Sequence, residues 1–445
     1  MGLRTRRLLD RAFAAAGLFA VGLMAVVLLL VLVPIFSRGA GAYVFRGTIE
    51  HRRFLLEQFG RGDAARVAAE TAAAAAARAP AFALLSRFEE TRDDLPPARR
   101  RELLADFREV RKGVSELLGP APGAPALLPR NAYGQTRWDR ARVKLDRVLR
   151  RQTWDYSGGV GRPVHTPREE LYAGTALAPL FPLLRDGIEA MLLPRTTFYA
   201  GFLTDRSLDA LFFGGIGPEV LGTVWLTLGA MLLAVPFGVI AAIYFQEYKR
   251  EGRVVIFLRS CVSTLAGVPS IVFGLFGLAF FINTLHVSPG KSVLAGALTL
   301  ALLVLPTVIR ASEEAIRAVP QAYKEAALAL GAGRWHTVLT VILPAALPGI
   351  LTGIVISMGR AAGETAPIIF TAAVSVGAAP GLLELFDRST PALPWNIYNI
   401  ATEHAAADEI RHVQYGMVAT LVAIVLALNL AAIVLRARVA RKQRG

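Results

Sequence analysis

Uncharged and charged stretches alternate along this chain of 445 residues. A helix that crosses a bilayer needs about 20 consecutive, mainly apolar residues. Six stretches approach or exceed this length, so the pattern predicts an all-α integral membrane protein with six transmembrane helices. The predicted spans are residues 12–36, 220–246, 260–285, 292–309, 349–376 and 416–435.

The first apolar stretch, residues 12–36, directly follows a segment with four arginines. A cleaved signal peptide has a shorter apolar core, of about 7–15 residues. The small residues Gly39 to Ala42 resemble a cleavage site, but the length of the apolar stretch favours an uncleaved first span.

Residues 37–210 differ in kind, because charged residues of both signs and many alanines replace the long apolar stretches. Helical patterns are found at residues 64–79, 98–118 and 131–154, with a shorter apolar stretch at 171–184. Pro80 is expected to end the first of these helices. The apolar stretch is too short for a span and predicts a membrane-surface or core helix. We therefore expect a mostly helical insert after the first span.

Lys and Arg gather beside particular ends of the predicted spans, and such residues favour the cytoplasmic side. The loops 247–259 and 310–348 and the tail 436–445 are rich in them. With six spans, all three lie on the same side as the N-terminus. Both termini are therefore predicted to be cytoplasmic, in a multi-pass protein of the cell (inner) membrane. The insert 37–210 then lies outside, since long domains cross largely regardless of charge. The predicted division is 1–36, 37–210, 211–435 and 436–445.

Composition narrows the function classes. The chain is 54% hydrophobic and 19% charged, which indicates a membrane domain with an appended polar domain. The net charge of +15 is explained by membrane topology, so no nucleic-acid partner is predicted. Cys261 is the single cysteine, and the six histidines are scattered. No metal site, no catalytic constellation and no phosphate-binding GxxxxGK loop are recognisable, so we predict a protein that is not an enzyme.

The fifth predicted span carries two charges, Arg360 and Glu364. A charge at the centre of a spanning helix costs roughly 2.5–3.5 kcal/mol on insertion scales. Residues four apart share a helix face, so the two side chains can pair and reduce that cost. The guanidinium is also a suitable partner for an oxyanion, because it offers several donors in one plane. The pair predicts either an anion path or a buried ion pair that orients helices.

A charged segment, residues 310–348, separates the fourth and fifth predicted spans. Its central residues are Glu325, Ala326, Ala327 and Gly331. Small residues on one helical face allow another protein to approach the backbone closely. Pro344 and Pro348 are expected to interrupt the helix where the chain re-enters the lipid. We therefore predict a cytoplasmic helix–turn–helix that contacts a partner protein.

The sequence resembles the A-type membrane subunit (PstA) of phosphate-specific ABC importers. The resemblance rests on LAGVPSIVFGLFG at 265–277, LPTVIR at 305–310 and GRAAGETAP at 359–367. The segment around Glu325 is similar to the EAA loop of binding-protein-dependent ABC importers, with Val341 in place of the usual Ile. The similarity covers about residues 212–435 and the first span, and the long insert departs from the family's shortest members.

This resemblance implies a permease of the type I ABC importer architecture. Residues 321–333 would form the coupling helix that docks on an ATPase subunit, around Glu325, Ala326, Ala327 and Gly331. In the family, arginines that match Arg310 and Arg360, and the acidic residue that matches Glu364, are associated with phosphate passage. Arg310 could equally be a positive-inside anchor at the end of its span.

The resemblance also implies partners. These are a homologous second permease in a heterodimer, two ATPase subunits, and an extracytoplasmic phosphate-binding protein. ATP would be used by the ATPase, and no cofactor is expected on this chain. Two alternatives stay open: the same machinery for another oxyanion such as phosphonate, sulfate or molybdate, and a membrane-anchored phosphate-signalling or sensor protein whose outer domain is the working part.

Overall fold

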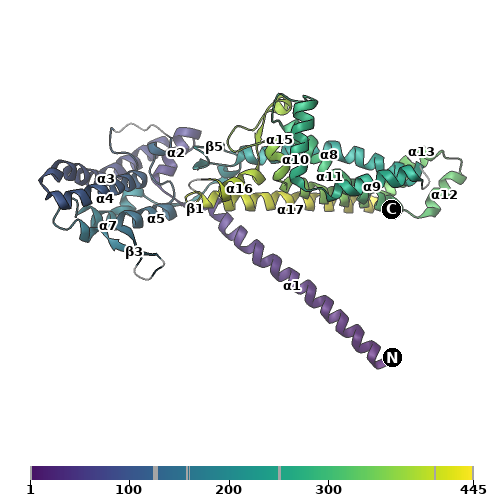
Figure 1. Cartoon of the computed structure of the whole chain (residues 1–445), viewed down its shortest axis with the longest axis horizontal. Helices are drawn as coiled ribbons and strands as arrows, with labels where there is room; N and C mark the ends of the chain where they lie inside the picture. The colour runs from purple at the N-terminus through teal and green to yellow at the C-terminus, as the bar shows by residue number, and fades with distance from the viewer. Residues whose placement is uncertain are drawn as a thin grey trace. The chain divides into compact units, whose positions relative to one another are not determined.

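The computed structural model describes residues 3–123, 129–156, 159, 161–248, 252–404 and 407–442. The chain divides into two compact units (Figure 1). Residues 1–42 and 201–445 form the membrane unit, and Tyr43–Ala200 form the insert unit. Lys249 and Arg250 of the predicted basic loop, and residues 443–445 of the predicted tail, lie outside the described residues.

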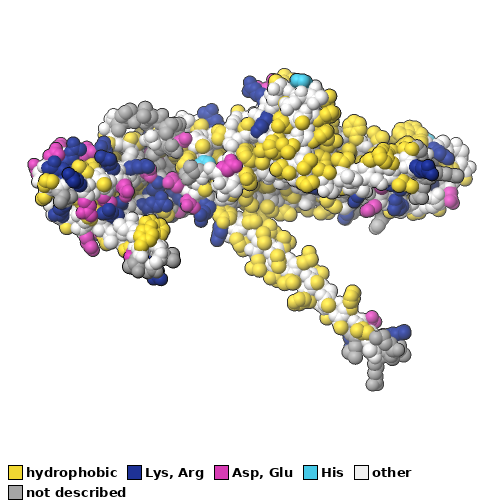
Figure 2. Space-filling view, viewed as in Figure 1, with side chains coloured by type: hydrophobic (Ala, Val, Ile, Leu, Met, Phe, Trp, Pro, Cys, Tyr) yellow, Lys and Arg dark blue, Asp and Glu magenta, His cyan; other side chains and the backbone are white. Residues whose placement is uncertain are grey.

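Within the described ranges, five helical stretches are long and apolar enough to cross a membrane. They are α1 (Leu3–Tyr43), α8 (Gly217–Ile243) with the π-helical η4 (Tyr244–Tyr248), α11 (Val293–Arg317), α13 (Arg334–Thr337) with the π-helical η6 (Val338–Ile342) and α14 (Leu343–Gly363), and α17 (Arg411–Lys442). Hydrophobic side chains cover the surface of α1 (Figure 2). The predicted all-α membrane class is confirmed.

The predicted span 260–285 is not one straight helix. α9 (Arg253–Gly267) and α10 (Ser270–Gly277), which continues into the π-helical η5 (Leu278–Thr284), are bent by 102° against each other. The bend falls at Val268, which is extended because the proline that follows it disfavours helical backbone. Counted as one broken span, this pair gives six spans in total.

The predicted span 349–376 is also corrected. Its helix begins earlier, at Arg334, and α14 ends at Gly363. Glu364 is extended, and α15 (Ala366–Thr371) starts a new short helix. Pro344 and Pro348 do not interrupt the helix, because Pro344 stands at the start of α14 after the wider π-helical turns of η6, and Pro348 lies inside α14.

The segment between the fourth and fifth spans is therefore shorter than the predicted loop 310–348. Helix α11 continues to Arg317, and α12 (Gln321–Ala329) lies in the connection to α13. On the other side of the unit are short elements and a further helix: η3 (Ala200–Leu203), β5 (Ser207–Leu208), β6 (Phe213–Gly214), β7 (Ala373–Val374), η7 (Leu382–Phe386), β8 (Thr390–Pro391) and α16 (Leu393–Thr402). β5 pairs with β6 antiparallel, and β7 pairs with β8 parallel.

Helix α11 lies at the centre of the membrane unit, packed against α8 on one side and α14 on another. Small residues permit this packing. A methyl group on Gly353 would overlap that of Ala311, and one on Gly349 would lie 2.7 Å from Ala315 Cβ. In lipid, helices associate through such close packing because there is little hydrophobic drive between them.

The insert unit is mostly helical, with short strand pairs. Its helices are α2 (Ile49–Phe59), α3 (Ala64–Thr91), η1 (Arg92–Asp94), α4 (Pro97–Leu118), η2 (Pro129–Ala132), α5 (Trp138–Leu149), α6 (Arg168–Leu171) and α7 (Leu180–Leu192). Its strands form two antiparallel pairs, β1 (Val44–Gly47) with β4 (Arg195–Phe198), and β2 (Arg150–Asp155) with β3 (Arg162–Pro167).

Three expectations for the insert change. Pro80 lies inside α3, since Ala81, Leu85 and Phe88 beyond it are buried and hold the helix in the core. The predicted helix 131–154 ends at Leu149 and continues as a strand. The apolar stretch predicted at the membrane surface or in the core supplies the buried start of α7, so it belongs to a core helix.

Buried arginines tie the insert helices together. Arg78 donates hydrogen bonds to Glu50 at 2.6 Å, to the Leu118 carbonyl at 2.7 Å and to the Met191 carbonyl at 2.8 Å. A buried charge needs such partners, because leaving one unpaired is strongly destabilising. Arg78 therefore joins α2, α3 and the ends of α4 and α7.

His51 of α2 is enclosed by aromatic rings and cations. Its ring meets Phe45 and Tyr199 edge-on, with centroids 5.1 and 5.3 Å away. Burial, and then the charges of Arg137 and Arg52, lower the pKa of His51 to about 3. The folded insert therefore holds this imidazole neutral, whereas the unfolded chain binds a proton near pH 6.5.

We expect the insert unit to lose stability as the pH falls below about 6.5. The unfolded state takes up a proton on His51 in this range and the folded state does not, so the loss from pH 7 to pH 5 is about 2 kcal/mol. Hydrogen exchange of the peptides of the insert, measured on the full chain at both pH values, would report it. His51→Gln should remove most of this dependence, whereas His165→Gln, an exposed control on β3, should leave it.

Gly353→Ala should destabilise the membrane unit by about 1–3 kcal/mol, because the added methyl group overlaps that of Ala311. The paired change Gly353→Ala with Ala311→Gly moves the methyl group to the other helix and should recover much of the loss. Thermal unfolding in detergent would measure both. Gly363→Ala is the control, since its methyl group meets nothing within 4 Å; equal losses for both single variants would contradict the close packing.

Candidate functional site

The charged pair of the fifth span lies at a break in the helix. Arg360 is in the last turn of α14, and Glu364 is the first residue after it. Arg360 Nε lies 3.3 Å from Glu364 Oε1, so the structure brings these two predicted site residues together. The arginine remains exposed enough to contact a further group, and the carboxylate is more enclosed.

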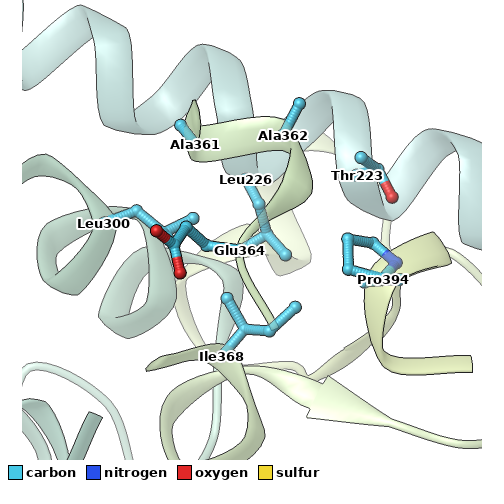
Figure 3. Close-up of a pocket in the computed structure, with 9 residues that line it drawn as sticks. Thr223, Leu226, Leu300, Ala361, Ala362, Glu364, Ile368 and Pro394 are labelled. Atoms are coloured by element: carbon cyan, nitrogen blue, oxygen red, sulfur yellow. The ribbon is translucent and has the colours of Figure 1, made fainter. Parts of the chain in front are cut away.

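Glu364 lines a small cavity between five helices (Figure 3). The walls come from α8, α11, α14, α15 and α16, and they are Thr223, Leu226, Leu300, Ala361, Ala362, Glu364, Ile368, Ala392 and Pro394. The cavity volume is about 10 Å³, which is close to the least that can hold one water molecule. An oxyanion does not fit in this volume.

Helix α16, which follows β8 in the sequence, contributes Pro394 to the cavity wall. Two polar contacts hold this helix on α8. The Leu393 N–H donates to Thr223 Oγ1 at 2.9 Å, and Asn396 Nδ2 donates to Glu219 Oε1 at 3.0 Å. All four residues are buried. Buried polar groups stabilise an arrangement only when they are paired, so these contacts define where α16 sits.

Arg310 lies elsewhere. Its Nη2 donates to Ser263 Oγ of α9 at 2.8 Å. Its neighbour Ala311 packs on Gly353, and Arg360 is seven residues beyond Gly353, which is about 10 Å along a helix. The structure therefore does not bring Arg310 to the pair of Arg360 and Glu364.

The predicted coupling segment forms a short exposed helix. α12 covers Gln321–Ala329, less than the predicted 321–333, and no residue of it is buried. Glu325, Ala326 and Ala327 lie within it. Gly331 has φ +86°, a left-handed backbone that suits glycine, and the next N–H bonds back to Ala327. The glycine thus ends the helix.

Sequence reasoning missed the polar contacts that surround these elements. Glu219 stood just before the uncharged stretch 220–246, and its position at a span end was the available signal. The sequence pattern did not predict that Glu219 contacts Asn396, which is 177 residues away. Lys324 pairs with Glu247 of η4, and a residue separation of 77 hides that contact. Among the described residues, no cluster of three or more metal-ligating His, Cys, Asp or Glu side chains occurs.

Within the part of the chain that the structure describes, five apolar spans and one further bent pair, with a charge pair beside a helix break, define a polytopic integral membrane protein. A family model described as the binding-protein-dependent transport system inner membrane component matches residues 234–445. The insert unit lies outside that match.

Named relatives agree with this class. The probable ABC transporter permease protein YqgI of Bacillus subtilis is 37% identical over 244 residues, covering 52% of this chain and 81% of that protein. The phosphate transport system permease protein PstA 1 of Mycobacterium tuberculosis is 40% identical over 240 residues, covering 53% and 74%. The probable phosphate transport system permease protein PstA of Methanocaldococcus jannaschii is 33% identical over 243 residues, covering 52% and 79%.

A solved structure of the MetNI methionine ABC transporter in an inward-facing conformation aligns with a TM-score of 0.40 and 18% identity, over 50% of this chain and 94% of that chain. The chain belongs to the family of binding-protein-dependent transport system inner membrane components. The family predicted from the sequence motifs is confirmed.

Proposed function

We propose that this chain is the membrane permease subunit of an ATP-driven phosphate importer. The relatives that are 33–40% identical and named as phosphate transport permeases support the choice of anion. The observation that carries the proposal is the pair of Arg360 and Glu364 at the break between α14 and α15, where Glu364 lines a small cavity.

The pair suits the passage of an oxyanion. The Arg360 guanidinium presents several N–H donors in a plane, which match the oxygens of a phosphate. Glu364 balances the charge while the path is empty, so the arginine is not left unpaired in an apolar surrounding. When a path opens beside the pair, the anion takes over part of this pairing. Arg310 of α11 is proposed as a second cationic residue that the anion meets along the path.

The exposed helix α12 is proposed as the docking site for an ATPase subunit. Large apolar side chains in and beside it are exposed, among them Tyr323, Leu328 and Leu330. Such a patch on a polar segment is typical of a protein–protein contact. ATP would be hydrolysed by that partner, and its movement would open and close the cavity at Glu364.

The assembly and orientation follow from the same proposal. A homologous second permease, two ATPase subunits and an extracytoplasmic phosphate-binding protein would complete the importer. Both termini would lie in the cytoplasm, on the side of α12, because Lys and Arg gather beside those span ends. The insert unit would then be extracytoplasmic. Labelling of a cysteine at position 325 from outside intact cells would contradict this orientation.

Arg360→Ala should lower phosphate uptake by about 10–100-fold, which corresponds to the loss of hydrogen bonds to a charged group. Arg360→Lys should retain part of the uptake, because it keeps the charge without the planar donors. The measurement is uptake of labelled phosphate in proteoliposomes that hold the complete transporter.

Arg388→Ala is the matched control, since Arg388 forms an exposed pair with Glu384 and contacts no residue of the cavity. Unchanged uptake in Arg360→Ala would remove the assigned role. Competition with sulfate, molybdate and phosphonate tests the anion itself: if one of these suppresses labelled uptake at lower concentrations than unlabelled phosphate does, the machinery is assigned to that anion.

Leu330→Asp should reduce co-purification of the ATPase subunits at least several-fold, because it places a charge in the proposed contact. Leu330 is 89% exposed, so the substitution should not disturb the fold of the chain itself. Leu383→Asp offers a control, since Leu383 is also 89% exposed but lies on η7, far along the sequence from α12. Equal recovery of the ATPase with both variants would place the docking site elsewhere.

A further inference from the structure

The coupling helix α12 is held to the spans by one polar contact. Lys324 Nζ donates to Glu247 Oε1, and both side chains are about 15% exposed, at 16% and 14%. Among the residues that the structure describes, no other side chain of α12 has a hydrogen bond or ion pair to another element. Helix α12 also packs against η6 and α13, but this ion pair is the polar contact that ties it to the span of α8 and η4.

Glu247 belongs to η4, the π-helical continuation of α8, which is far from α12 in the sequence. The chain connects α12 directly to α11 and α13. The ion pair adds a third connection, to a span that begins about 100 residues earlier. Because Glu247 and Lys324 are largely shielded from water, their attraction is stronger than that of an exposed surface pair.

The other end of α8 carries the two contacts that hold α16. Glu219 and Thr223 lie in the first two turns of α8, and they bond to Asn396 and to the Leu393 N–H. From Glu219 to Glu247 there are 28 residues, which is about 42 Å of helix. In the membrane unit, α12 and α16 lie near opposite ends of the span formed by α8 and η4 (Figure 1).

Polar contacts thus fix both ends of the span formed by α8 and η4. The partly buried pair of Glu247 and Lys324 connects it to the proposed ATPase-docking helix, and the buried contacts of Glu219 and Thr223 connect it to α16. The cavity walls divide accordingly. Thr223, Leu226, Ala392 and Pro394 come from α8 and from α16 with its entry, whereas Ala361, Ala362, Glu364 and Ile368 belong to α14, α15 and the break between them. A shift of α8 along or across its axis moves the first set against the second.

We propose that α8 transmits displacement of α12 to α16, with Glu247–Lys324 as the inner tie and Glu219–Asn396 as the outer tie, and that this movement opens and closes the cavity at Glu364. These four residues are positioning residues for transport. This transmission rests on one part of the proposed function, namely that a partner ATPase moves α12. It does not depend on which anion is carried.

The test uses the complete transporter with spin labels at Ile356→Cys of α14 and Tyr398→Cys of α16, in a Cys261→Ser background. Ile356 and Tyr398 are both exposed. The distance between the labels is measured without nucleotide and after trapping with ATP and vanadate. We expect trapping to change this distance in the parent, and Glu247→Lys or Lys324→Glu to reduce the change by more than half. The double variant Glu247→Lys/Lys324→Glu restores the pair in reverse and should restore the change.

The outer tie is tested in the same way. Glu219→Gln keeps an oxygen for Asn396 and should preserve the response, whereas Glu219→Leu removes the acceptor and should weaken it. Glu314→Lys is the control for the inner tie, since it reverses an exposed charge near the end of α11 that lies outside α12 and η4. It should leave the distance change intact. Co-purified ATPase and its basal hydrolysis show that each variant is assembled.

The proposal is overturned if the parent distance does not respond to nucleotide, if the single charge reversals leave the response unchanged, or if the double variant behaves no better than the singles. Either of the last two results would assign the transmission to the chain connections of α12 with α11 and α13. Because nucleotide drives this readout, it stands or falls separately from phosphate uptake, which tests the anion.

Discussion

The constraint on which the membrane unit depends is that a charge placed among apolar helices must have a partner. Arg360 and Glu364 satisfy each other at 3.3 Å, and the helix ends between them. A continuous α14 would also allow the two to pair, since they are four residues apart. The break adds something further, because it turns the carboxylate into a cavity wall and starts α15 on the other side.

The same rule governs the rest of the chain. Glu219 is buried at the start of α8 and bonds to Asn396, and Lys324 meets Glu247 at its end. In the insert unit, Glu50 and Arg78 are buried together, and Arg78 also donates to carbonyls at two helix ends. Buried charge pairs are weak contributors to stability but costly to break. Their value here is in fixing which elements lie together, since the wrong neighbour would leave a charge unpaired.

Close packing supplies the second constraint. Gly353 against Ala311, and Gly349 against Ala315, bring α14 and α11 together through small residues. With so little space at this contact, α11 and α14 are held together at the halves that lie nearer to α12 in the sequence. The cavity at Glu364 lies further along both helices, where α15 and α16 complete its walls. With these helices in place, the cavity beside the ion pair is too small for an oxyanion.

The sequence by itself determined the class, the spans and the candidate charge pair. Uncharged stretches of sufficient length identify spans without any tertiary information, because lipid admits only backbones that satisfy their own hydrogen bonds. Arg360 and Glu364 were recognisable for the same reason, as charges inside such a stretch, and the motif spacing around Glu325 and Gly331 marked an exposed helix. The left-handed backbone at Gly331 explains why that spacing requires glycine.

Only the tertiary structure decided where helices break and which distant residues meet. Hydropathy does not register the bend at Val268 or the end of α14 at Gly363, since mainly apolar residues continue on both sides of each. Pro344 and Pro80 showed the converse, because local rules predicted interruptions that π-helical turns and core packing absorbed. The pairs Glu219–Asn396 and Glu247–Lys324 join residues 177 and 77 positions apart, and such contacts exist only once the helices are packed side by side.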